Sequence, residues 1–414
     1  MKMFDVIRTH LFALPTLVKF AIGMAVIVSV PRFARRIYLP AGVSLLLMGV
    51  VVGPHVLDLV HTNAPIADFF GDLGKLMLMF FSGLEINLAL FKRTRVRSMT
   101  FGLITTTIPL LLGTIVALWL GYPFVPSVVV GSLLASHTLL GSPIVMQLGV
   151  NRLEPVAITI GATMVSDTLS LIVFAICVPT FVSGFSVSGL VVQLIKIIVL
   201  IPLILFGISR LGAYFLKMVE DEEGAYFVLL LAILAVSAVL AQLANLPGIV
   251  GAFLAGLAVN SAVRDKPAKG KLEFLGNSLF IPIFFIVTGF LIDPIVFGRS
   301  IVDNFSAVAG LIVALLIGKA IAVAIVGRAF NYSPAAQMTM WSLTLPQVAA
   351  TLAATLVAYS TFNSSGQRLL DQKMLNAVLV LVLFTSVLGP ILTQHYAPLM
   401  LKTDSNDRPG VAHA

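Results

Sequence analysis

The most constraining feature of this chain is the length of its apolar stretches, such as the run from Val156 to Val178. Crossing about 30 Å of hydrocarbon takes roughly 20 apolar residues in a helix, and stretches of this length recur along the 414 residues. The chain is 59% hydrophobic and only 11% charged, whereas a soluble domain is about 25% charged. A soluble fold cannot bury so much apolar surface. We therefore expect an all-α polytopic membrane protein.

Other features narrow this class. A transmembrane barrel needs alternating strands of roughly ten residues, but the apolar stretches here are long and continuous. The net charge of +8 comes from basic residues in short loops beside apolar stretches, a pattern of topology signals and lipid contacts rather than of nucleic-acid binding. Cys177 is the only cysteine, so no disulfide within the chain is expected. The N-terminal segment lacks a small-residue cleavage site and is interpreted as a retained helix.

Charge clusters, prolines and glycines divide the chain into candidate membrane spans. We expect thirteen, at roughly 14–31, 40–57, 70–91, 98–120, 125–149, 155–178, 188–216, 224–243, 246–262, 274–292, 302–327, 335–360 and 374–400. With the N-terminus outside, 17 Lys and Arg fall in inside segments and 5 in outside segments, and the other four lie within spans. Lys and Arg are enriched in cytoplasmic loops. We therefore expect a multi-pass protein of the cell (inner) membrane, with the N-terminus outside and the C-terminus cytoplasmic.

Two pairs of segments resemble each other at a distance of seven spans. Leu39–Gly53 (LPAGVSLLLMGVVVG) resembles Leu246–Asn260 (LPGIVGAFLAGLAVN), and Phe80–Ile86 (FFSGLEI) resembles Phe284–Asp293 (FFIVTGFLID). Because seven is odd, the two copies cross the membrane in opposite directions. We expect a first inverted repeat of six helices at 1–187, a linker helix at 188–216, a second repeat of six helices at 217–401 and a short cytoplasmic tail at 402–414. Inverted repeats are typical of secondary transporters, whose substrate binds near the midplane between them.

Two spans carry helix-breaking residues at matched positions of the repeats, in ASHTLLGSP (Ala135–Pro143) and SLTLPQ (Ser342–Gln347). A break frees backbone groups, which is tolerated in a membrane where they line a polar cavity. Discontinuous helices at corresponding places indicate the substrate site. The residues expected at the breaks are Ser136, His137, Gly141 and Pro143 in the first and Thr344 and Pro346 in the second.

Asp167 lies near the centre of the sixth span. A charge there costs roughly 2.5–3.5 kcal/mol on insertion scales, so a functional reason for it is expected. Thr163 and Ser170, at i−4 and i+3, share its helix face and form a polar stripe. A protonated Asp that only joins helices by hydrogen bonds is the structural alternative.

Lys319 is the only charge deep in the eleventh span. We hypothesise that it pairs with Asp167 when no ion is bound, because each would relieve the other's desolvation, and that a cation or proton at Asp167 releases it. Snorkelling of Lys319 toward the cytoplasmic interface is the alternative.

Other charged or titratable residues give weaker signals. His137 could titrate near neutral pH or make only structural hydrogen bonds. Glu85 and Asp293 are expected to cap or anchor helices, and Lys196 to snorkel or contact lipid headgroups. The acidic segment Glu220–Gly224 (EDEEG) is interpreted as a solvated loop.

Five segments together resemble the monovalent cation:proton antiporters, in the branch with sodium/proton antiporters and potassium-efflux antiporters. They are YLPAGVSLLLMGVVVGP, FGDLGKLMLMFFSGLEINL, ASHTLLGSPIV, GATMVSDTLSLIVFA and FIPIFFIVTGFLIDP. The resemblance implies a homodimer with a dimerisation domain and a mobile core. The core carries two crossed, discontinuous helices beside an essential Asp, and it moves in elevator fashion to expose the site alternately. It implies that Asp167 is this carboxylate, with Ser166, Thr138 and Thr163 around the cation or proton, that Lys319 is the core lysine, and that the crossing lies at Thr138 and Thr344.

Ser166 departs from the family pattern. Electrogenic members have a second Asp immediately before the essential one, and others have Asn or Gln. One carboxylate suggests exchange of one proton for one cation, although Lys319 could itself carry a proton. The chain ends soon after the last span, so we expect no regulatory nucleotide-binding domain of the kind found on potassium-efflux relatives.

Other classes of protein remain as alternatives. A sodium-coupled symporter of a small organic anion can share crossed, broken helices. An intramembrane aspartyl protease needs two carboxylates at one site, and only one midplane Asp is found. A retinal-type protein could use Lys319 as a Schiff base, but thirteen spans with inverted repeats do not suit it. We expect a transporter of Na⁺ or K⁺ and H⁺ in contact with membrane lipid, without enzyme activity, cofactor or nucleic-acid partner.

Overall fold

Helices form the regular structure of this protein. The computed structural model describes residues 15–34, 36, 40–58, 65–84, 88–150, 153–184, 186–219, 222–263, 267–290 and 293–407. Within these ranges the extended structure is limited to an isolated bridge between Phe362 and Arg368. The predicted all-α class is confirmed.

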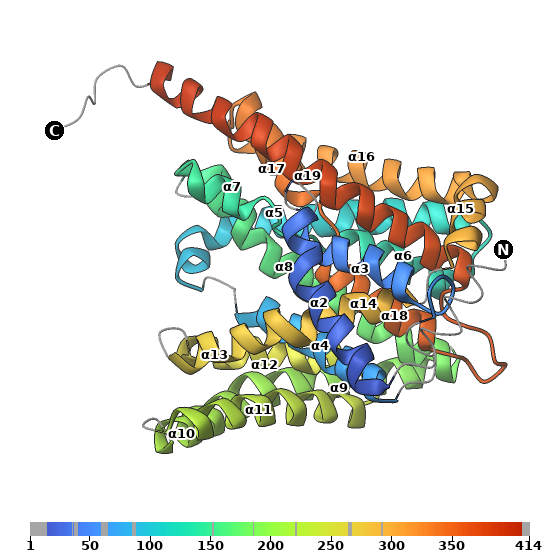
Figure 1. Cartoon of the computed structure of the whole chain (residues 1–414). Coiled ribbons are helices and arrows are strands. Elements are labelled where there is room, and N and C mark those ends of the chain that lie inside the picture. The colour runs from blue at the N-terminus through green and yellow to red at the C-terminus, as the bar shows by residue number, and fades with distance from the viewer. Residues whose placement is uncertain are drawn as a thin grey trace. The chain divides into compact units, whose positions relative to one another are not determined.

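The chain divides into two compact units, and each unit is assembled from two separate parts of the sequence. Unit 1 comprises Met1–Glu85 and Leu194–Asp303, and unit 2 comprises Ile86–Gln193 and Asn304–Ala414. The helices of unit 1 are α2 (Thr16–Ala34), α3 (Ala41–Val52), α4 (Pro65–Leu84), η3 (Leu203–Ile208), α10 (Ser209–Met218), α11 (Glu223–Leu243), α12 (Gly248–Val263), α13 (Pro267–Leu275), η4 (Gly276–Phe280), α14 (Ile281–Phe290) and α15 (Pro294–Asp303). Those of unit 2 are α5 (Leu88–Trp119), α6 (Phe124–Ala135), α7 (Ser142–Gln147), α8 (Glu154–Ser183), α16 (Phe305–Ala329), α17 (Pro334–Thr344), α18 (Ala349–Ser360) and α19 (Gln372–Asp407), while α9 (Val187–Pro202) contributes to both units (Figure 1).

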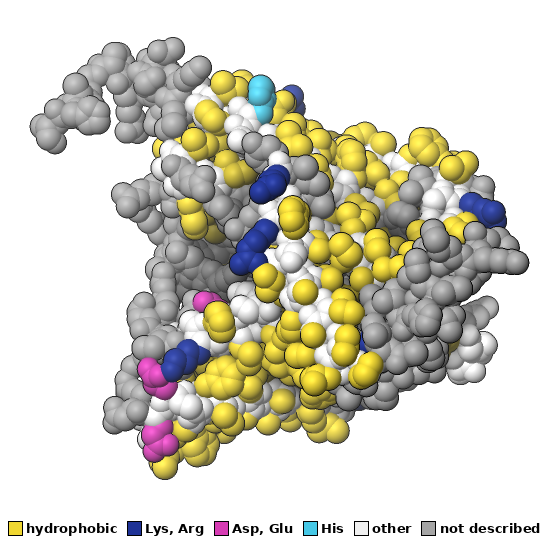
Figure 2. Space-filling view, in the orientation of Figure 1, with side chains coloured by type: hydrophobic (Ala, Val, Ile, Leu, Met, Phe, Trp, Pro, Cys, Tyr) yellow, Lys and Arg dark blue, Asp and Glu magenta, His cyan; other side chains and the backbone are white. Residues whose placement is uncertain are grey.

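Many of these helices suit a membrane. Among the described residues, eight helices are long and apolar enough to cross one, and four shorter apolar helices accompany them. Large side chains are exposed on them, including Ile198, Phe206 and Val228, and hydrophobic side chains predominate on the face shown in Figure 2. Exposure of this kind is stable where the solvent is lipid. The chain is therefore a multi-pass membrane protein, and the count of thirteen spans stays a prediction.

The helix boundaries differ most from the prediction at α5. The fourth span was expected to begin near residue 98, but α5 begins at Leu88. The added residues include the basic segment Lys92–Arg97. Lys and Arg are good helix formers, so the helix continues past the end of its apolar part.

Two helix pairs in unit 1 pack through glycines. A methyl group at Gly49 of α3 would collide with the carbonyl oxygen of Ile286 on α14, and one at Gly289 of α14 would collide with that of Leu46. The pair α4 and α12 repeats the arrangement: a methyl group at Gly83 would collide with the carbonyl oxygen of Phe253, and one at Gly256 with that of Phe80. Close approach of two backbones requires such small residues.

These two pairs correspond to each other in the predicted repeats. Gly49 and Gly256 occupy the same position in the two similar LP segments. The α3–α14 pair joins spans 2 and 10, and the α12–α4 pair joins spans 9 and 3. This correspondence is consistent with the predicted inverted repeat, and the repeat and its boundaries 1–187, 188–216 and 217–401 stay predictions.

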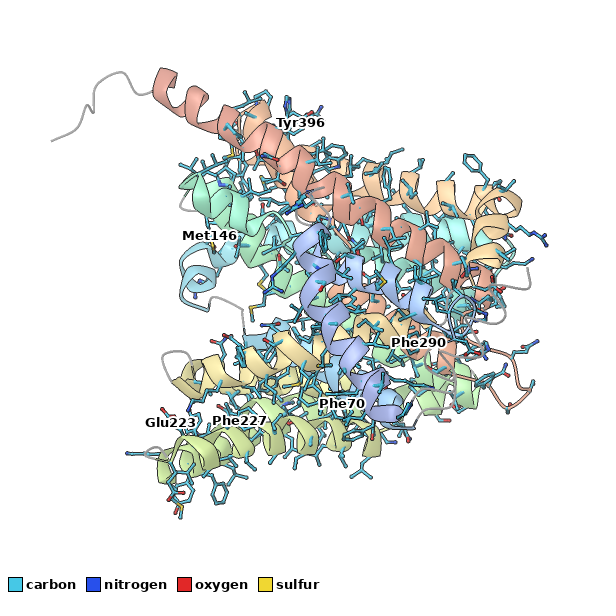
Figure 3. All side chains as sticks on the ribbon, viewed as in Figure 1. Phe70, Met146, Glu223, Phe227, Phe290 and Tyr396 are labelled. Atoms are coloured by element: carbon cyan, nitrogen blue, oxygen red, sulfur yellow. The ribbon has the colours of Figure 1, made fainter. Side chains whose placement is uncertain are left out.

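Aromatic stacking accompanies the glycine contacts. Phe70 of α4, labelled in Figure 3, stacks on Phe280 of η4, with ring centroids 5.3 Å apart and an interplanar angle of 20°. Stacked rings with centroids 4.5–7 Å apart contribute about 0.5–1.5 kcal/mol beyond their buried area. This contact fixes α4 against the start of α14.

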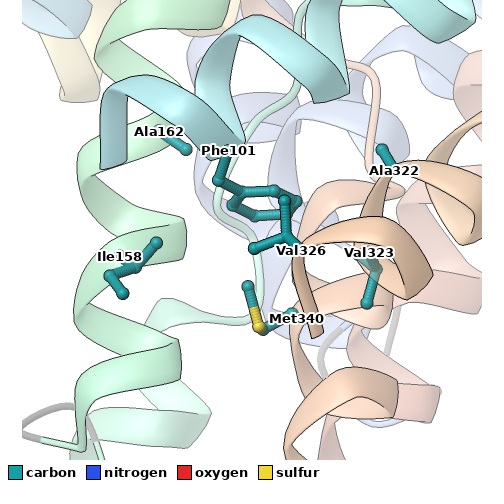
Figure 4. Packing of buried hydrophobic residues seen from close by; sticks show 7 residues of the cluster. All are labelled: Phe101, Ile158, Ala162, Ala322, Val323, Val326 and Met340. Atoms are coloured by element: carbon teal, nitrogen blue, oxygen red, sulfur yellow. The ribbon is translucent and has the colours of Figure 1, made fainter. Parts of the chain in front are cut away.

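Four helices of unit 2 share an apolar core. Its buried members come from α5, α8, α16 and α17, and they are Phe101, Ile158, Ala162, Ala322, Val323, Val326 and Met340 (Figure 4). Such packing holds α8 and α16, the helices that carry Asp167 and Lys319, in a fixed relation.

Candidate functional site

Two interrupted helices meet in unit 2. Helix α6 ends at Ala135 and α7 begins at Ser142, while α17 ends at Thr344 and α18 begins at Ala349. Pro346 has no N–H to donate to a helical hydrogen bond, so the second break is favoured locally.

The two breaks are joined through hydrogen bonds. The Thr138 N–H donates to the Pro346 carbonyl at 2.8 Å, and the Val348 N–H donates to Thr138 Oγ1 at 3.3 Å. The predicted break residues therefore lie together. Ser136, His137 and Gly141 lie in or at the end of the first gap, the backbone of Pro143 is already helical, and Thr344 is the last residue of α17.

Asp167 lies in the middle of α8 with its carboxylate against the end of α6. Ser136 Oγ donates to Asp167 Oδ1 at 2.7 Å, and the backbone N–H of His137 also donates to this carboxylate. Asp167 is buried. A buried carboxylate requires such donors, because an unpaired charge in a low-dielectric region is strongly unfavourable.

The predicted pairing of Lys319 with Asp167 stays a prediction, and in this structure the Lys319 ammonium binds other groups. In the described part of the chain, Lys319 Nζ bonds only backbone carbonyls, those of Ala135 at 2.9 Å, Thr105 at 3.1 Å and Ser136 at 3.5 Å. The physical reason is the break itself. The last carbonyls of an interrupted helix have no intrahelical donor and form the negative end of its dipole, so the fully buried ammonium binds there.

Ser136 connects the two charged groups. Its hydroxyl donates to Asp167 while its carbonyl accepts from Lys319. The opposite charges of Asp167 and Lys319 also interact through space. The two groups are thus coupled through one residue of the break rather than by contact.

His137, Thr163 and Ser166 form a separate hydrogen-bonded group. His137 Nε2 lies 3.0 Å from Thr163 Oγ1, and its Nδ1 lies 3.2 Å from Ser166 Oγ. Among the described contacts, neither hydroxyl bonds the Asp167 carboxylate. Thr163 and Ser166 stay predicted neighbours of the cation. In this structure they position the imidazole, because both its nitrogens need partners when it is buried.

Gln347 was missed as a site residue by the sequence analysis. It is fully buried, its Nε2 donates to the Ser136 carbonyl at 2.6 Å, and its Oε1 accepts from Thr351 Oγ1 at 2.8 Å. Its N–H donates to Thr385 Oγ1 at 3.2 Å. The signal in the sequence is an amide directly after Pro346 in an apolar span, where an unpaired polar group would be costly.

Of the two residues predicted to cap or anchor helices, the structure describes Asp293 but not Glu85. Asp293 Oδ1 accepts the Ile295 N–H at the start of α15, which agrees with the predicted capping role. Glu85 lies outside the described residues.

A tyrosine outside the spans is tied to an acidic residue. In the loop between α5 and α6, the Tyr122 hydroxyl donates to Asp371 Oδ1 at 2.8 Å. Burial, followed by the hydrogen bond and the negative charge of Asp371, raises the pKa of Tyr122 above its ordinary value. The contact joins the start of α6 to the start of α19.

The ligand atoms that the site offers next to the Asp167 carboxylate are mainly hydroxyl and carbonyl oxygens. No group of three or more His, Cys, Asp and Glu side chains able to hold a metal ion occurs among the residues that the structure describes. Carboxylate, hydroxyl and carbonyl oxygens are the ligands of hard cations. Fold and site together define an all-helical, multi-pass membrane protein with a buried carboxylate at the junction of two discontinuous helices.

Comparison with known proteins assigns the family. The family model described as "Sodium/hydrogen exchanger, transmembrane" matches residues 22–397. The chain belongs to this family, which confirms the resemblance to the cation:proton antiporters.

Individual relatives extend over most of this chain. The Na(+)/H(+) antiporter NhaS5 of Synechocystis is 42% identical over 382 residues, which are 92% of this chain and 55% of that protein. This chain therefore spans about half the length of that relative. The probable Na(+)/H(+) antiporter 3 of Methanocaldococcus jannaschii is 25% identical over 91% of this chain and 95% of its own.

A solved structure shows the same fold. The sodium proton antiporter MjNhaP1 of Methanocaldococcus jannaschii superposes with a TM-score of 0.67 over 93% of this chain and 97% of its own, at 17% sequence identity. At this identity the likeness concerns the fold alone.

Proposed function

We propose that this protein is a secondary active transporter that exchanges a monovalent cation, Na⁺ or K⁺, for protons across the cell membrane. The observation that carries the proposal is the single carboxylate of Asp167, buried in the middle of α8 against the end of an interrupted helix. The family match and the two antiporter relatives agree with it.

The coupling follows from the cost of the buried charge. An ionised Asp167 without a partner is unfavourable at this depth, and either a proton or a cation relieves that cost. Both cannot bind at full strength, because a protonated carboxyl has lost the charge that attracts the cation. Asp167 is thus the shared carrier, and crossing with one or the other bound gives exchange.

Lys319 serves as a fixed charge near the site. Its ammonium is held by carbonyls at the end of α6 and reaches Asp167 through Ser136. We infer that it limits the site to one cation and supports a ratio of one proton to one cation. The contacts of Ser166 with His137 rather than with Asp167 agree with a single carboxylate at the site.

We propose that the two units have different roles in alternating access. Unit 2 contains Asp167, Lys319 and both breaks, so we propose that it is the mobile core of an elevator mechanism. Unit 1 would provide the dimer contact. The predicted orientation, with the N-terminus outside, belongs to the same proposal.

Reconstitution tests the proposed function. The purified protein is placed in vesicles containing a pH dye, and Na⁺, K⁺ and Li⁺ gradients are applied with the membrane potential clamped and unclamped. Cation-dependent proton flux that does not respond to voltage is expected. Sodium-driven uptake of an organic anion without proton flux would instead support the symporter alternative and overturn the antiporter proposal.

A further inference from the structure

A small chamber lies in unit 2 beside Ser136, the residue whose hydroxyl donates to the Asp167 carboxylate. Its volume is about 10 Å³, which is room for about one water-sized species. Four hydroxyl side chains line it: Ser132 and Ser136 from the end of α6, Ser170 from α8 and Thr351 from α18. The function proposed above uses only Ser136 of these four.

The hydrogen of each hydroxyl is already used. Ser132 Oγ donates to the Val129 carbonyl at 2.7 Å. Ser170 Oγ donates to the Asp167 carbonyl at 3.0 Å, and Ser136 Oγ donates to the Asp167 carboxylate at 2.7 Å.

Thr351 completes the set, since its Oγ1 donates to Gln347 Oε1 at 2.8 Å. A hydroxyl has one hydrogen and two lone pairs. A hydroxyl oxygen that faces the chamber therefore offers a lone pair, and none of these four side chains has a free hydrogen to donate.

The remaining wall of the chamber is apolar. The residues that complete the lining are all buried, and they are Leu133, Leu171, Phe174, Ala350 and Ala354. Attraction between opposite charges is stronger in such low-dielectric surroundings than in water. Ser136 bonds the Asp167 carboxylate, whereas Ser170 bonds the Asp167 backbone carbonyl, so Ser136 alone links the chamber to the charge of the site. The positive charge of Lys319, bonded at Ala135 and Ser136, opposes this attraction and sets its strength.

We propose that this hydroxyl chamber holds a dehydrated monovalent cation next to Asp167, and that Ser132, Ser170 and Thr351 set cation affinity and selectivity. The proposal rests on the function proposed above and adds a second cation position to it. A cation in the chamber passes to Asp167 without returning to water, because Ser136 borders both positions.

Matched controls exist on the same helices. Ser127 of α6 is buried and bonds the Pro123 carbonyl, and Thr355 of α18 is buried and bonds the Thr351 carbonyl. They have the same chemistry as Ser132 and Thr351 but do not line the chamber. Ser127→Ala and Thr355→Val therefore report the effect of losing an ordinary helix hydroxyl.

The experiment compares Ser132→Ala, Ser170→Ala and Thr351→Val with these controls in the reconstituted full-length protein. We expect each chamber variant to raise the apparent KM for Na⁺ at least threefold and to change the order of Na⁺, Li⁺ and K⁺, while the controls keep wild-type values. Equal KM values and equal ion preference in chamber and control variants would overturn the proposed cation site in the chamber, and the proposed exchange function would still stand. Absence of cation-dependent proton flux in the wild type would overturn the proposed function itself.

A further variant covers the case in which alanine at position 170 does not fold. Ser170→Cys keeps the size of the side chain and replaces a hard oxygen by a soft sulfur. We expect it to weaken transport of Na⁺ relative to Tl⁺. An unchanged ratio of Na⁺ to Tl⁺ transport, with normal elution of the purified variant, would contradict the chamber.

Discussion

Asp167 combines a high desolvation cost with only a few donors, and this combination suits it to bind and release ions. Its partners in the described structure are the Ser136 hydroxyl and the His137 backbone N–H. A carboxylate with many fixed donors would keep its charge permanently satisfied. The small number of partners leaves room for a proton or a cation to complete its environment.

The first prediction for a single residue concerns Asp167→Asn. We expect cation–proton exchange to fall to the background of empty vesicles, because an amide neither carries a charge nor takes up the transported proton. The fold should persist, since an amide oxygen still accepts from Ser136. Dye-based flux and size-exclusion elution measure the two effects. Flux within a factor of ten of the wild type would contradict the role of Asp167.

Lys319 gives a second prediction, on stability. Lys319→Ala leaves the carbonyls of Thr105 and Ala135 without this donor, at about 1–3 kcal/mol for each buried unsatisfied group. Lys319→Gln retains an N–H donor and should recover part of the loss. The melting temperature in detergent should therefore rank wild type, Gln and Ala in descending order. Equal melting temperatures for the two variants would show that the hydrogen bonds do not determine stability.

Tyr122 gives a prediction on pH. Its folded pKa lies above the unfolded value of about 10, so its contribution to stability is complete below pH 10 and decreases as the pH rises toward the folded pKa. Tyr122→Phe removes this pH-dependent contribution to stability. Between about pH 9.5 and 11 we therefore expect the melting temperature of the wild type to fall further than that of Tyr122→Phe. Parallel curves would contradict the contact with Asp371.

Among the elements, the glycine-packed pairs of unit 1 are the most sensitive to substitution. Backbone lies against backbone at Gly49 and at Gly256, the matching position in the predicted repeat. We predict that Gly49→Ala and Gly256→Ala each destabilise by about 1–3 kcal/mol, as overpacking does. Gly23 of α2 has nothing within 4 Å of an added methyl group, so Gly23→Ala should be neutral or slightly stabilising. Melting temperatures of the three variants in detergent test the repeat. A tolerated Gly256→Ala beside a damaging Gly49→Ala would argue against equivalent packing.

The interrupted helices show what local sequence can and cannot predict. Pro346 and Gly141 predicted where helices break, because proline removes a donor and glycine relaxes the backbone. The contact of Thr138 with Pro346 joins residues far apart in the chain. Such long-range hydrogen bonds depend on how four helices pack, which no local pattern specifies.

For the whole molecule, the orientation in the membrane can be tested directly. In a Cys177→Ser background, Ser364→Cys lies in the exposed loop before α19, and Glu222→Cys lies exposed before α11. The excess of Lys and Arg on one side predicts that position 364 is outside and position 222 inside. A membrane-impermeant thiol reagent applied to intact cells should label only Ser364→Cys. Labelling of Glu222→Cys alone would reverse the orientation.

The sequence by itself determined the all-helical membrane class, the family, the carboxylate at Asp167 and the sites of the two breaks. These follow from composition and local chemistry, since apolar length, proline and an isolated charge act where they stand. The tertiary structure decided which groups the buried polar residues of the site contact. It placed Lys319 on the carbonyls of α6 instead of on Asp167, turned Thr163 and Ser166 toward His137, and brought Gln347 to Ser136. The physical reason is that buried donors and acceptors bind the nearest unsatisfied group, and only the packed helices determine which group is nearest.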